Sequence, residues 1–252
     1  HPPSTQYFIN TCQAILNQPL GRLFVRSFYA NWHWLAINEQ TNTRELEYFL
    51  TAFGHGPYPG CSLPTLFYSA CSVRNLPIVQ FLLEYEDGKL LDEYIQEDTG
   101  SRREKLLQLL IYATIEDFLP ATKYLLSLDN SLASMVFGHW HTTPLMLACY
   151  CKAQNTVQYL CSMTSACVVD STGCSALHYA IAGRNLCIVQ YLIEHAGMVV
   201  RETVDELRER DEGLCLRPPV TCVQYALCNI KVGEQRSIKA SILSYVSKKK
   251  GS

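Results

Sequence analysis

The chain has 252 residues, of which 48% are hydrophobic and 17% charged, and its formal net charge is -2. This composition supplies enough apolar material for a folded protein and excludes a disordered chain or a strongly basic nucleic-acid binder. The dense basic run Lys248-Lys249-Lys250 falls in a C-terminal tail, 247–252, which we expect to be solvated rather than a nucleic-acid or targeting patch. No stretch approaches the roughly 18 consecutive apolar residues that a membrane-spanning helix requires, so we expect a soluble protein.

A short phrase that ends in an aromatic residue and leucine recurs along the chain. Its copies are Ile78-Val79-Gln80-Phe81-Leu82, Ala121-Thr122-Lys123-Tyr124-Leu125, Thr156-Val157-Gln158-Tyr159-Leu160 and Ile188-Val189-Gln190-Tyr191-Leu192. Each copy follows, at constant distance, a pair that begins with a small residue: Ala70-Cys71, Ala113-Thr114, Ala148-Cys149 and Ala180-Ile181. Successive alanines lie 43, 35 and 32 residues apart. Two of these intervals lie near a period of about 33 residues, which indicates a repeat architecture with an insertion of about ten residues in the first interval.

The N-terminal part of the chain is expected to hold a cap and two repeats. Residues 1–29 are rich in apolar side chains and are predicted to add helix that covers the first repeat, because terminal repeats are usually atypical. The first repeat is expected at 30–53 and the second at 62–84, where Thr65 and the Ala70-Cys71 pair precede the first copy of the phrase. The chain begins with His1 rather than methionine, so we expect it to be a segment of a longer protein.

Residues 85–104 interrupt the period. This first insertion is rich in acidic residues before Gly100-Ser101-Arg102-Arg103, and we expect it to project from the stack, because inserts map to loops between repeats. The third repeat, 105–128, keeps the apolar spacing but has lost the threonine and proline that open a helix.

The fourth repeat, 140–163, is the clearest unit. Thr143-Pro144 predicts a sharp helix start, because threonine can cap a helix and proline is tolerated in its first turn. Leu145 and Ala148 follow at helical spacing, and the recurring phrase predicts a second helix. A helix pair this short cannot bury its apolar face alone, so it must stack on its neighbours.

The fifth repeat, 173–196, follows the turn Asp170-Ser171-Thr172-Gly173, in which aspartate and glycine supply turn chemistry. These two units resemble ankyrin repeats, whose pattern D-x-x-G-x-T-P-L-H-x-A-A precedes a V-V-x-x-L-L helix. Thr143-Pro144-Leu145 matches one portion of that pattern and Leu177-His178-x-Ala180 matches another. The resemblance covers residues about 30 to 245 and implies an all-α solenoid of helix-turn-helix units. It also implies that His178 ties hairpin and helix together by hydrogen bonds.

The last part of the chain is expected to hold a second insertion and a final repeat. The insertion, 197–218, contains a run of alternating charge that is typical of an exposed helix, which is either solvated or a surface for a particular partner. The sixth repeat is expected at 219–246. The array at 30–246 therefore has about six repeats and two insertions.

Proteins that resemble ankyrin arrays bind partners on the concave surface formed by hairpin tips and first helices. Tyr112, Leu147, Tyr179 and Tyr225 each stand one residue before a repeat alanine, Tyr150 lies three residues after Leu147, and Trp140 lies in a hairpin. Tyrosine and tryptophan are frequent binding anchors. The candidate partner-binding residues are therefore Tyr112, Trp140, Leu147, Tyr150, Tyr179 and Tyr225. If they bind, Tyr112→Ala with Tyr179→Ala should abolish partner capture and leave thermal unfolding nearly unchanged. The alternative is that the tyrosines pack between first helices and that Trp140 packs under an insertion.

Catalytic and metal-binding patterns do not emerge from the sequence. Many of the twelve cysteines occupy small buried positions of the repeat, which favours a reduced, intracellular setting. Cys149-x-Cys151 and His139-x-His141 lack the paired spacing of a zinc site, so we expect neither a metal nor another cofactor. The chain has no G-x-S-x-G elbow, phosphate-cradling glycine loop or H-E-x-x-H motif, so we expect no enzyme.

The sequence predicts a non-catalytic module that binds a protein or peptide on the concave ankyrin surface and recruits it to a larger protein or complex. We expect no nucleic-acid partner, a monomer as an isolated segment, and an intracellular, cytoplasmic location, with the nucleus left open. The alternative is a structural or oligomerisation segment of a channel or scaffold, which an apolar patch on the convex face or on the insertions would favour.

Overall fold

The computed structural model describes residues 62–96 and 100–196, together with positions 43, 44, 46, 47, 50, 241, 244, 245 and 248. The chain divides into two compact units, His1–Tyr112 and Ala113–Ser252, and each is described by itself. Apart from those isolated positions, the predicted cap 1–29, the repeats 30–53 and 219–246 and the insertion 197–218 lie outside the described residues.

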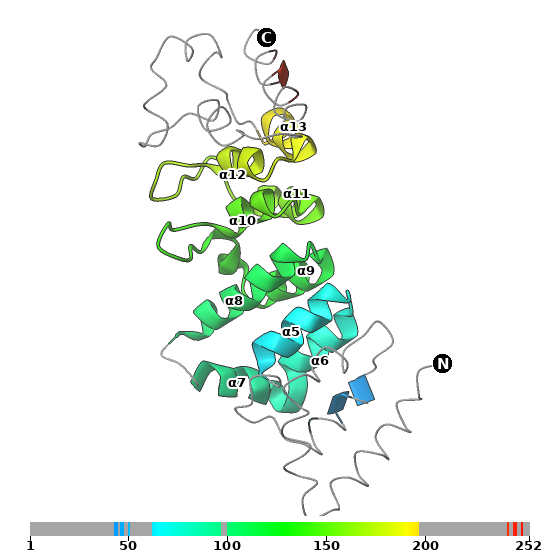
Figure 1. Ribbon diagram of the computed structural model, residues 1–252. Helices are drawn as coiled ribbons and strands as arrows, with labels where there is room; N and C mark the ends of the chain where they lie inside the picture. Colours follow the sequence, from blue (N-terminus) through cyan, green and yellow to red (C-terminus); the bar gives the residue numbers. More distant parts are fainter. Residues whose placement is uncertain are drawn as a thin grey trace, which may run out of the picture. The chain divides into compact units, whose positions relative to one another are not determined.

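In the first unit, α5 (Leu63–Ser72) and α6 (Leu76–Glu84) form a helix pair (Figure 1). Both helices have a proline in their first turn, where the missing amide hydrogen costs no helical bond. Asn75 caps α6, because its side-chain oxygen accepts a hydrogen bond from the amide of Ile78 at 3.2 Å. Phe67 and Val79 are fully buried in the core of this pair.

The predicted first insertion, 85–104, is not a projecting loop. It contains η1 (Tyr85–Gly88), α7 (Lys89–Gln96) and the start of α8 (Arg102–Ile115), and α7 packs against α5 and α6. Leu90, Leu91 and Tyr94 are buried, and their spacing of one and three residues places them on one helical face. The expected projection was wrong because the insert forms a helix with an apolar face, and burial of that apolar surface decides where the segment lies.

In the second unit, the described helices form two layers (Figure 1). The first helices, α10 (Pro144–Tyr150) and α12 (Ala176–Ala182), pack side by side. The second helices, α9 (Leu119–Leu128), α11 (Gln154–Met163) and α13 (Leu186–Glu194), form the other layer, and η2 (Asn130–Ser134) follows α9. The predicted all-α fold of helix-turn-helix units is confirmed for the part of the chain that the structure describes.

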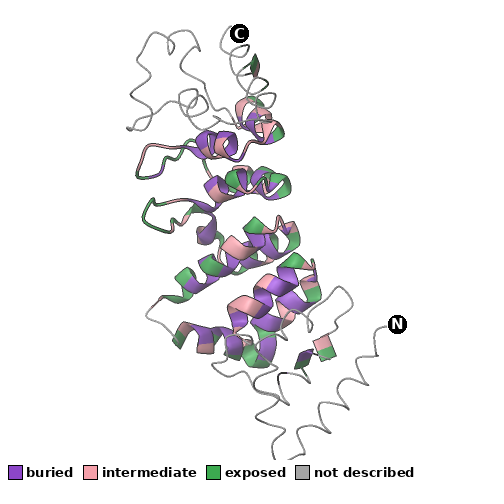
Figure 2. Cartoon of the chain, in the orientation of Figure 1, coloured by how far each residue is buried: buried purple, intermediate pink, exposed green. Residues whose placement is uncertain are grey.

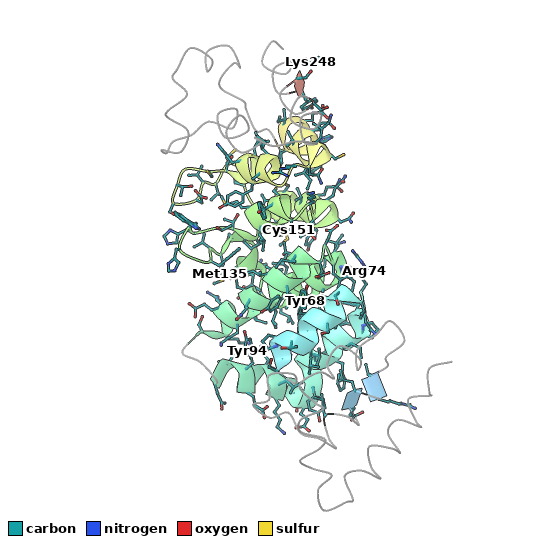
Figure 3. The ribbon with its side chains drawn as sticks, viewed as in Figure 1. Tyr68, Arg74, Tyr94, Met135, Cys151 and Lys248 are labelled. Atoms are coloured by element: carbon teal, nitrogen blue, oxygen red, sulfur yellow. The ribbon has the colours of Figure 1, made fainter. Side chains whose placement is uncertain are left out.

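The same turn joins the two helices of each pair. The residue four positions after the repeat alanine lies in this turn and has a positive φ: 57° at Arg74, 46° at Asp117, 65° at Lys152 and 58° at Arg184. The next residue donates its amide to the carbonyl of that alanine, at 2.9 Å from Asn75 to Ala70 and from Ala153 to Ala148. Figure 3 labels Arg74 and Cys151, which lie in two of these turns. Since the bonds recur at every alanine, the alanine spacing read from the sequence is the structural period.

Candidate protein-interaction surface

Asp170 organises the hairpin that precedes α12. Its Oδ1 atom accepts hydrogen bonds from the backbone amides of Thr172 and Cys174, at 2.8 and 2.9 Å, and from the Thr172 hydroxyl at 2.7 Å. Its Oδ2 atom accepts the Tyr179 hydroxyl at 2.8 Å. Burial raises the pKa of Asp170, but these hydrogen bonds outweigh it, and the net pKa lies below its ordinary value. The carboxylate is therefore ionised at neutral pH and holds the turn, in which Gly173 supplies the left-handed residue with φ 83°.

The starts of α10 and α12 are capped at equivalent positions. The hydroxyl of Thr143 accepts a hydrogen bond from the amide of Met146 at 3.3 Å. In the next repeat, the buried His178 ring nitrogen Nδ1 accepts the amide of Ser175 at 3.0 Å and lies 3.0 Å from the Ser175 hydroxyl. The structural role predicted for His178 is confirmed, since its Nδ1 atom fixes the helix start.

The hairpins before α10 and α12 are joined to each other. Each is closed by a single β-bridge, Phe137 to Thr142 in one and Val169 to Ser175 in the other. The amide of Ser171 donates to the carbonyl of Trp140 at 2.9 Å, so the Trp140 backbone is tied to the next hairpin. Its indole side chain nevertheless remains 61% exposed. Trp140 is thus a large aromatic side chain on a fixed backbone.

The two hairpins that Trp140 joins carry further exposed side chains. We call this set the hairpin surface, and its members are Val136, His139, Trp140, His141, Val168 and Val169. The sequence prediction missed the three valines. The available signal was the repeat itself, because Val136 and Val168 are separated by the same 32 residues as the alanines of these two repeats.

The predicted site residues fall into distinct surroundings. Trp140 and Tyr150 are strongly exposed, 61% and 54%, and lie before and at the end of α10. Leu147 on α10 and Tyr179 on α12 are half-buried on neighbouring first helices. Tyr112 belongs to the first unit, where its ring lies 5.6 Å from that of Tyr68 in an edge contact. Tyr225 lies outside the described residues. The binding role of all six stays a prediction.

Tyr179 has a structural role in addition to any contact with a partner. Its hydroxyl donates to Asp170 and lies 3.4 Å from the Thr142 hydroxyl of the preceding hairpin. Burial, together with the bond to the ionised Asp170, raises the pKa of Tyr179 to about 12, so the hydroxyl keeps its proton at neutral pH. Substituting Tyr179 therefore changes the hairpins as well as the surface.

The chemistry available to the cysteines is limited by their surroundings. Burial raises the pKa of the thiols of Cys149, Cys151, Cys161 and Cys174, that of Cys161 to about 11. These thiols are protonated at neutral pH and are poor nucleophiles. In the ranges 62–96 and 100–196 and at the isolated positions, no group of three His, Cys, Asp or Glu residues could hold a metal ion. None of the helices described there has the length and hydropathy needed to cross a membrane.

Paired short helices, a recurring left-handed turn and linked hairpins define a helical repeat protein. Residues 110–203 match the protein family described as ankyrin repeats (3 copies). The match supports ankyrin repeats in residues 110–203, the part of the chain that contains the predicted motifs at Thr143-Pro144-Leu145 and Leu177-His178. No curated protein matches the chain. Ankyrin repeats are in general protein–protein interaction modules and are typically not enzymes.

Proposed function

We propose that this chain is a non-catalytic module that binds a protein or peptide through the hairpin surface and the adjoining first helices, and that recruits it to a larger protein or complex. The observation that carries the proposal is Trp140, whose indole is 61% exposed while its carbonyl is bonded to Ser171 of the next hairpin. Tryptophan is enriched among residues that dominate binding energy. A side chain held in this way loses little backbone freedom when a partner covers it.

The chemistry of the hairpin surface favours a neutral, apolar or aromatic partner segment. Its members are three valines, a tryptophan and two histidines. The carboxylate of the neighbouring Asp170 is buried and already accepts hydrogen bonds within the chain. Nucleic-acid binding depends on lysine and arginine contacts with phosphates, and the hairpin sequences 136–142 and 168–175 contain neither residue. This composition supports a protein or peptide partner over a nucleic acid.

The arrangement of the titratable groups supports a role without catalysis. His178 is buried and its Nδ1 atom is used in the cap of α12, and the thiols with raised pKa values remain protonated. The free cysteines of the described repeats fit a reducing compartment, so we place the protein in the cytoplasm.

The test is quantitative affinity capture with the full chain in three forms: wild type, Trp140→Ala and the matched control Leu128→Ala. Leu128 is also an exposed apolar side chain, 49% exposed, but it lies on a second helix. Since both residues are exposed, each substitution should change the free energy of unfolding by less than about 0.5 kcal/mol. Trp140→Ala should lower the recovery of a specific partner about tenfold or more, and Leu128→Ala should leave it unchanged. Equal recovery with all three forms would contradict the proposal.

A further inference from the structure

The second helices of the second unit carry a recurring pair of side chains. Tyrosine is followed four residues later by a large side chain in each: Tyr124 and Leu128 on α9, Tyr159 and Met163 on α11, and Tyr191 and His195 at the end of α13. Residues four apart share a helix face. The tyrosines are half-buried, whereas Leu128 is 49% and Met163 39% exposed, and Figure 2 shows exposed residues along α11. Because α11 packs against both α9 and α13, the three pairs form one surface, which we call the outer stripe.

Within the three helices of the outer stripe, charged residues occur only on the outer two, α9 and α13. The sequence of α11 contains no charged residue. On α9 the single charged residue is Lys123, whose ammonium group lies 5.2 Å from the centre of the Tyr159 ring. On α13 it is the exposed Glu194, which also accepts a hydrogen bond from the Tyr245 hydroxyl. The stripe is therefore positive at the α9 end, neutral in the middle and negative at the α13 end.

We propose that the outer stripe binds a second copy of this chain in a two-fold symmetric dimer, with α11 at the symmetry axis. In such an interface the same patch is used by both subunits, and if residue i of one copy contacts residue j of the other, j also contacts i. An axis through α11 sets α9 of one copy against α13 of the other. Lys123 then pairs with Glu194 of the second copy at both ends, and the Tyr159 and Met163 side chains of both copies pack in the centre.

The charge pattern is what selects a second copy as the occupant. A partner of uniform charge would meet repulsion at one end of the stripe, whereas a reversed copy meets opposite charge at both ends.

The size of the outer stripe limits the affinity of the dimer. Helices of nine or ten residues are about 14 Å long and pack about 10 Å apart, so the face measures about 14 by 30 Å. An interface of this size lies at the low end for specific complexes, so the dimer should be weak.

The inference is independent of the proposed function and departs from the monomer expected from the sequence. Tyr124, Tyr159 and Tyr191 of the recurring phrase are half-buried rather than enclosed, so part of each ring is open to a partner.

Sedimentation velocity of the full chain, up to concentrations on the order of 100 μM, tests the dimer. Wild type should pass from monomer to dimer as concentration rises, and added salt should weaken the dimer because Lys123 and Glu194 are exposed. Lys123→Glu and Glu194→Lys should each weaken association about tenfold, and the double variant should recover it because the pairs re-form with reversed sign. Tyr245→Phe removes the hydrogen bond that the Tyr245 hydroxyl donates to Glu194 and should leave association unchanged.

A chain that stays monomeric at the highest concentration would overturn the proposal, as would a double variant that does not recover association. Trp140→Ala serves as the matched control, since it lies in a hairpin and should leave the dimer intact. If the wild type forms no dimer but its capture of a partner depends on Trp140, the outer stripe alone is refuted. If the wild type forms the dimer but capture does not depend on Trp140, the hairpin surface alone is refuted.

Discussion

The carboxylate of Asp117 caps α11 by accepting hydrogen bonds from Thr156, which lies 39 positions later in the chain. Its Oδ1 atom accepts the amide of Thr156 at 3.0 Å and the Thr156 hydroxyl at 2.9 Å, and its Oδ2 atom accepts the side-chain amide of Asn155 at 3.0 Å. The N-cap residue of α11 is Ala153, which has no side-chain acceptor. The preceding repeat therefore supplies both the acceptor and the negative charge that favour a helix N-terminus.

Asp117→Ala should lower the free energy of unfolding by about 2 kcal/mol, because it removes the cap and leaves the buried Thr156 hydroxyl without this acceptor. Asp117→Asn keeps an oxygen acceptor and tolerates the positive φ at this turn, so its loss should be less than half as large. Urea unfolding at neutral pH measures both. An unchanged stability in Asp117→Ala would show that the cap contributes nothing.

Asp170 should make the stability of the fold depend on pH. Its pKa in the folded protein lies below the ordinary value of 3.8, so the ionised carboxylate stabilises the fold at pH values above that point. This contribution is lost as the pH falls through the folded-state pKa. The stability difference between wild type and Asp170→Asn should be largest near neutral pH and should shrink below about pH 4. Urea unfolding over a pH series checks this, and a difference that does not vary with pH would contradict it.

Tyr179→Phe should lower the free energy of unfolding by about 1 to 2 kcal/mol, because the hydroxyl bonded to the ionised Asp170 is lost. This replaces the expectation that substitution of Tyr179 leaves thermal unfolding nearly unchanged. Tyr150→Phe is the matched control, since Tyr150 is exposed and should tolerate loss of its hydroxyl. Thermal unfolding of the two variants makes the comparison, and equal melting temperatures would argue against a structural role for the Tyr179 hydroxyl.

Gly183→Ala should be strongly destabilising. A Cβ atom at this position would lie 2.5 Å from the carbonyl oxygen of Tyr150 and 2.8 Å from that of Cys149, so α10 and the turn after α12 would have to move apart. Overpacking of this kind costs about 1 to 3 kcal/mol. Gly138→Ala is the control for backbone conformation, since nothing lies within 4 Å of its Cβ position but its φ is +67°. A smaller loss at Gly183 than at Gly138 would mean that the helix layers adjust easily.

Thr114→Val should raise the free energy of unfolding by about 1 kcal/mol. Thr114 is fully buried, and its hydroxyl has no hydrogen-bond partner within the described parts of the chain. Thr122 is equally buried, but its hydroxyl donates to the Phe118 carbonyl at 3.3 Å, so Thr122→Val should give no gain. Chemical denaturation of both variants is the measurement. A loss of stability in Thr114→Val would indicate that the hydroxyl has a partner after all.

The sequence predicted the period of the fold because the same packing position recurs at regular intervals along the chain. Ala70, Ala148 and their equivalents are small where helices approach, and each accepts the amide that closes the turn. The left-handed residues at those turns could not be predicted in the same way, since Arg74 and Lys152 stand where glycine would adopt that conformation at least cost.

The candidate site was predicted less completely than the fold. The exposure of Trp140 was one of two alternatives that the sequence left open. The bond from Ser171 that fixes its backbone joins two different repeats and leaves no local pattern. Asp117 likewise has no local pattern that predicts its role, because its partner Thr156 belongs to α11 of the next repeat. Contacts between repeats depend on stacking geometry, which one-dimensional periodicity does not contain.

The cap supplied by Asp117 also gives the array a direction during synthesis. Because Asp117 is translated before Thr156, a chain growing on the ribosome already carries the acceptor when α11 emerges, and folding from the N-terminal side meets no uncapped intermediate at this helix. Folding that began from α12 and α13 would form α11 without its cap. A chain that starts after Asp117 keeps the residues of α10 to α13 but loses this acceptor, so the repeat that holds Asp117 completes the second helix of the repeat that follows it.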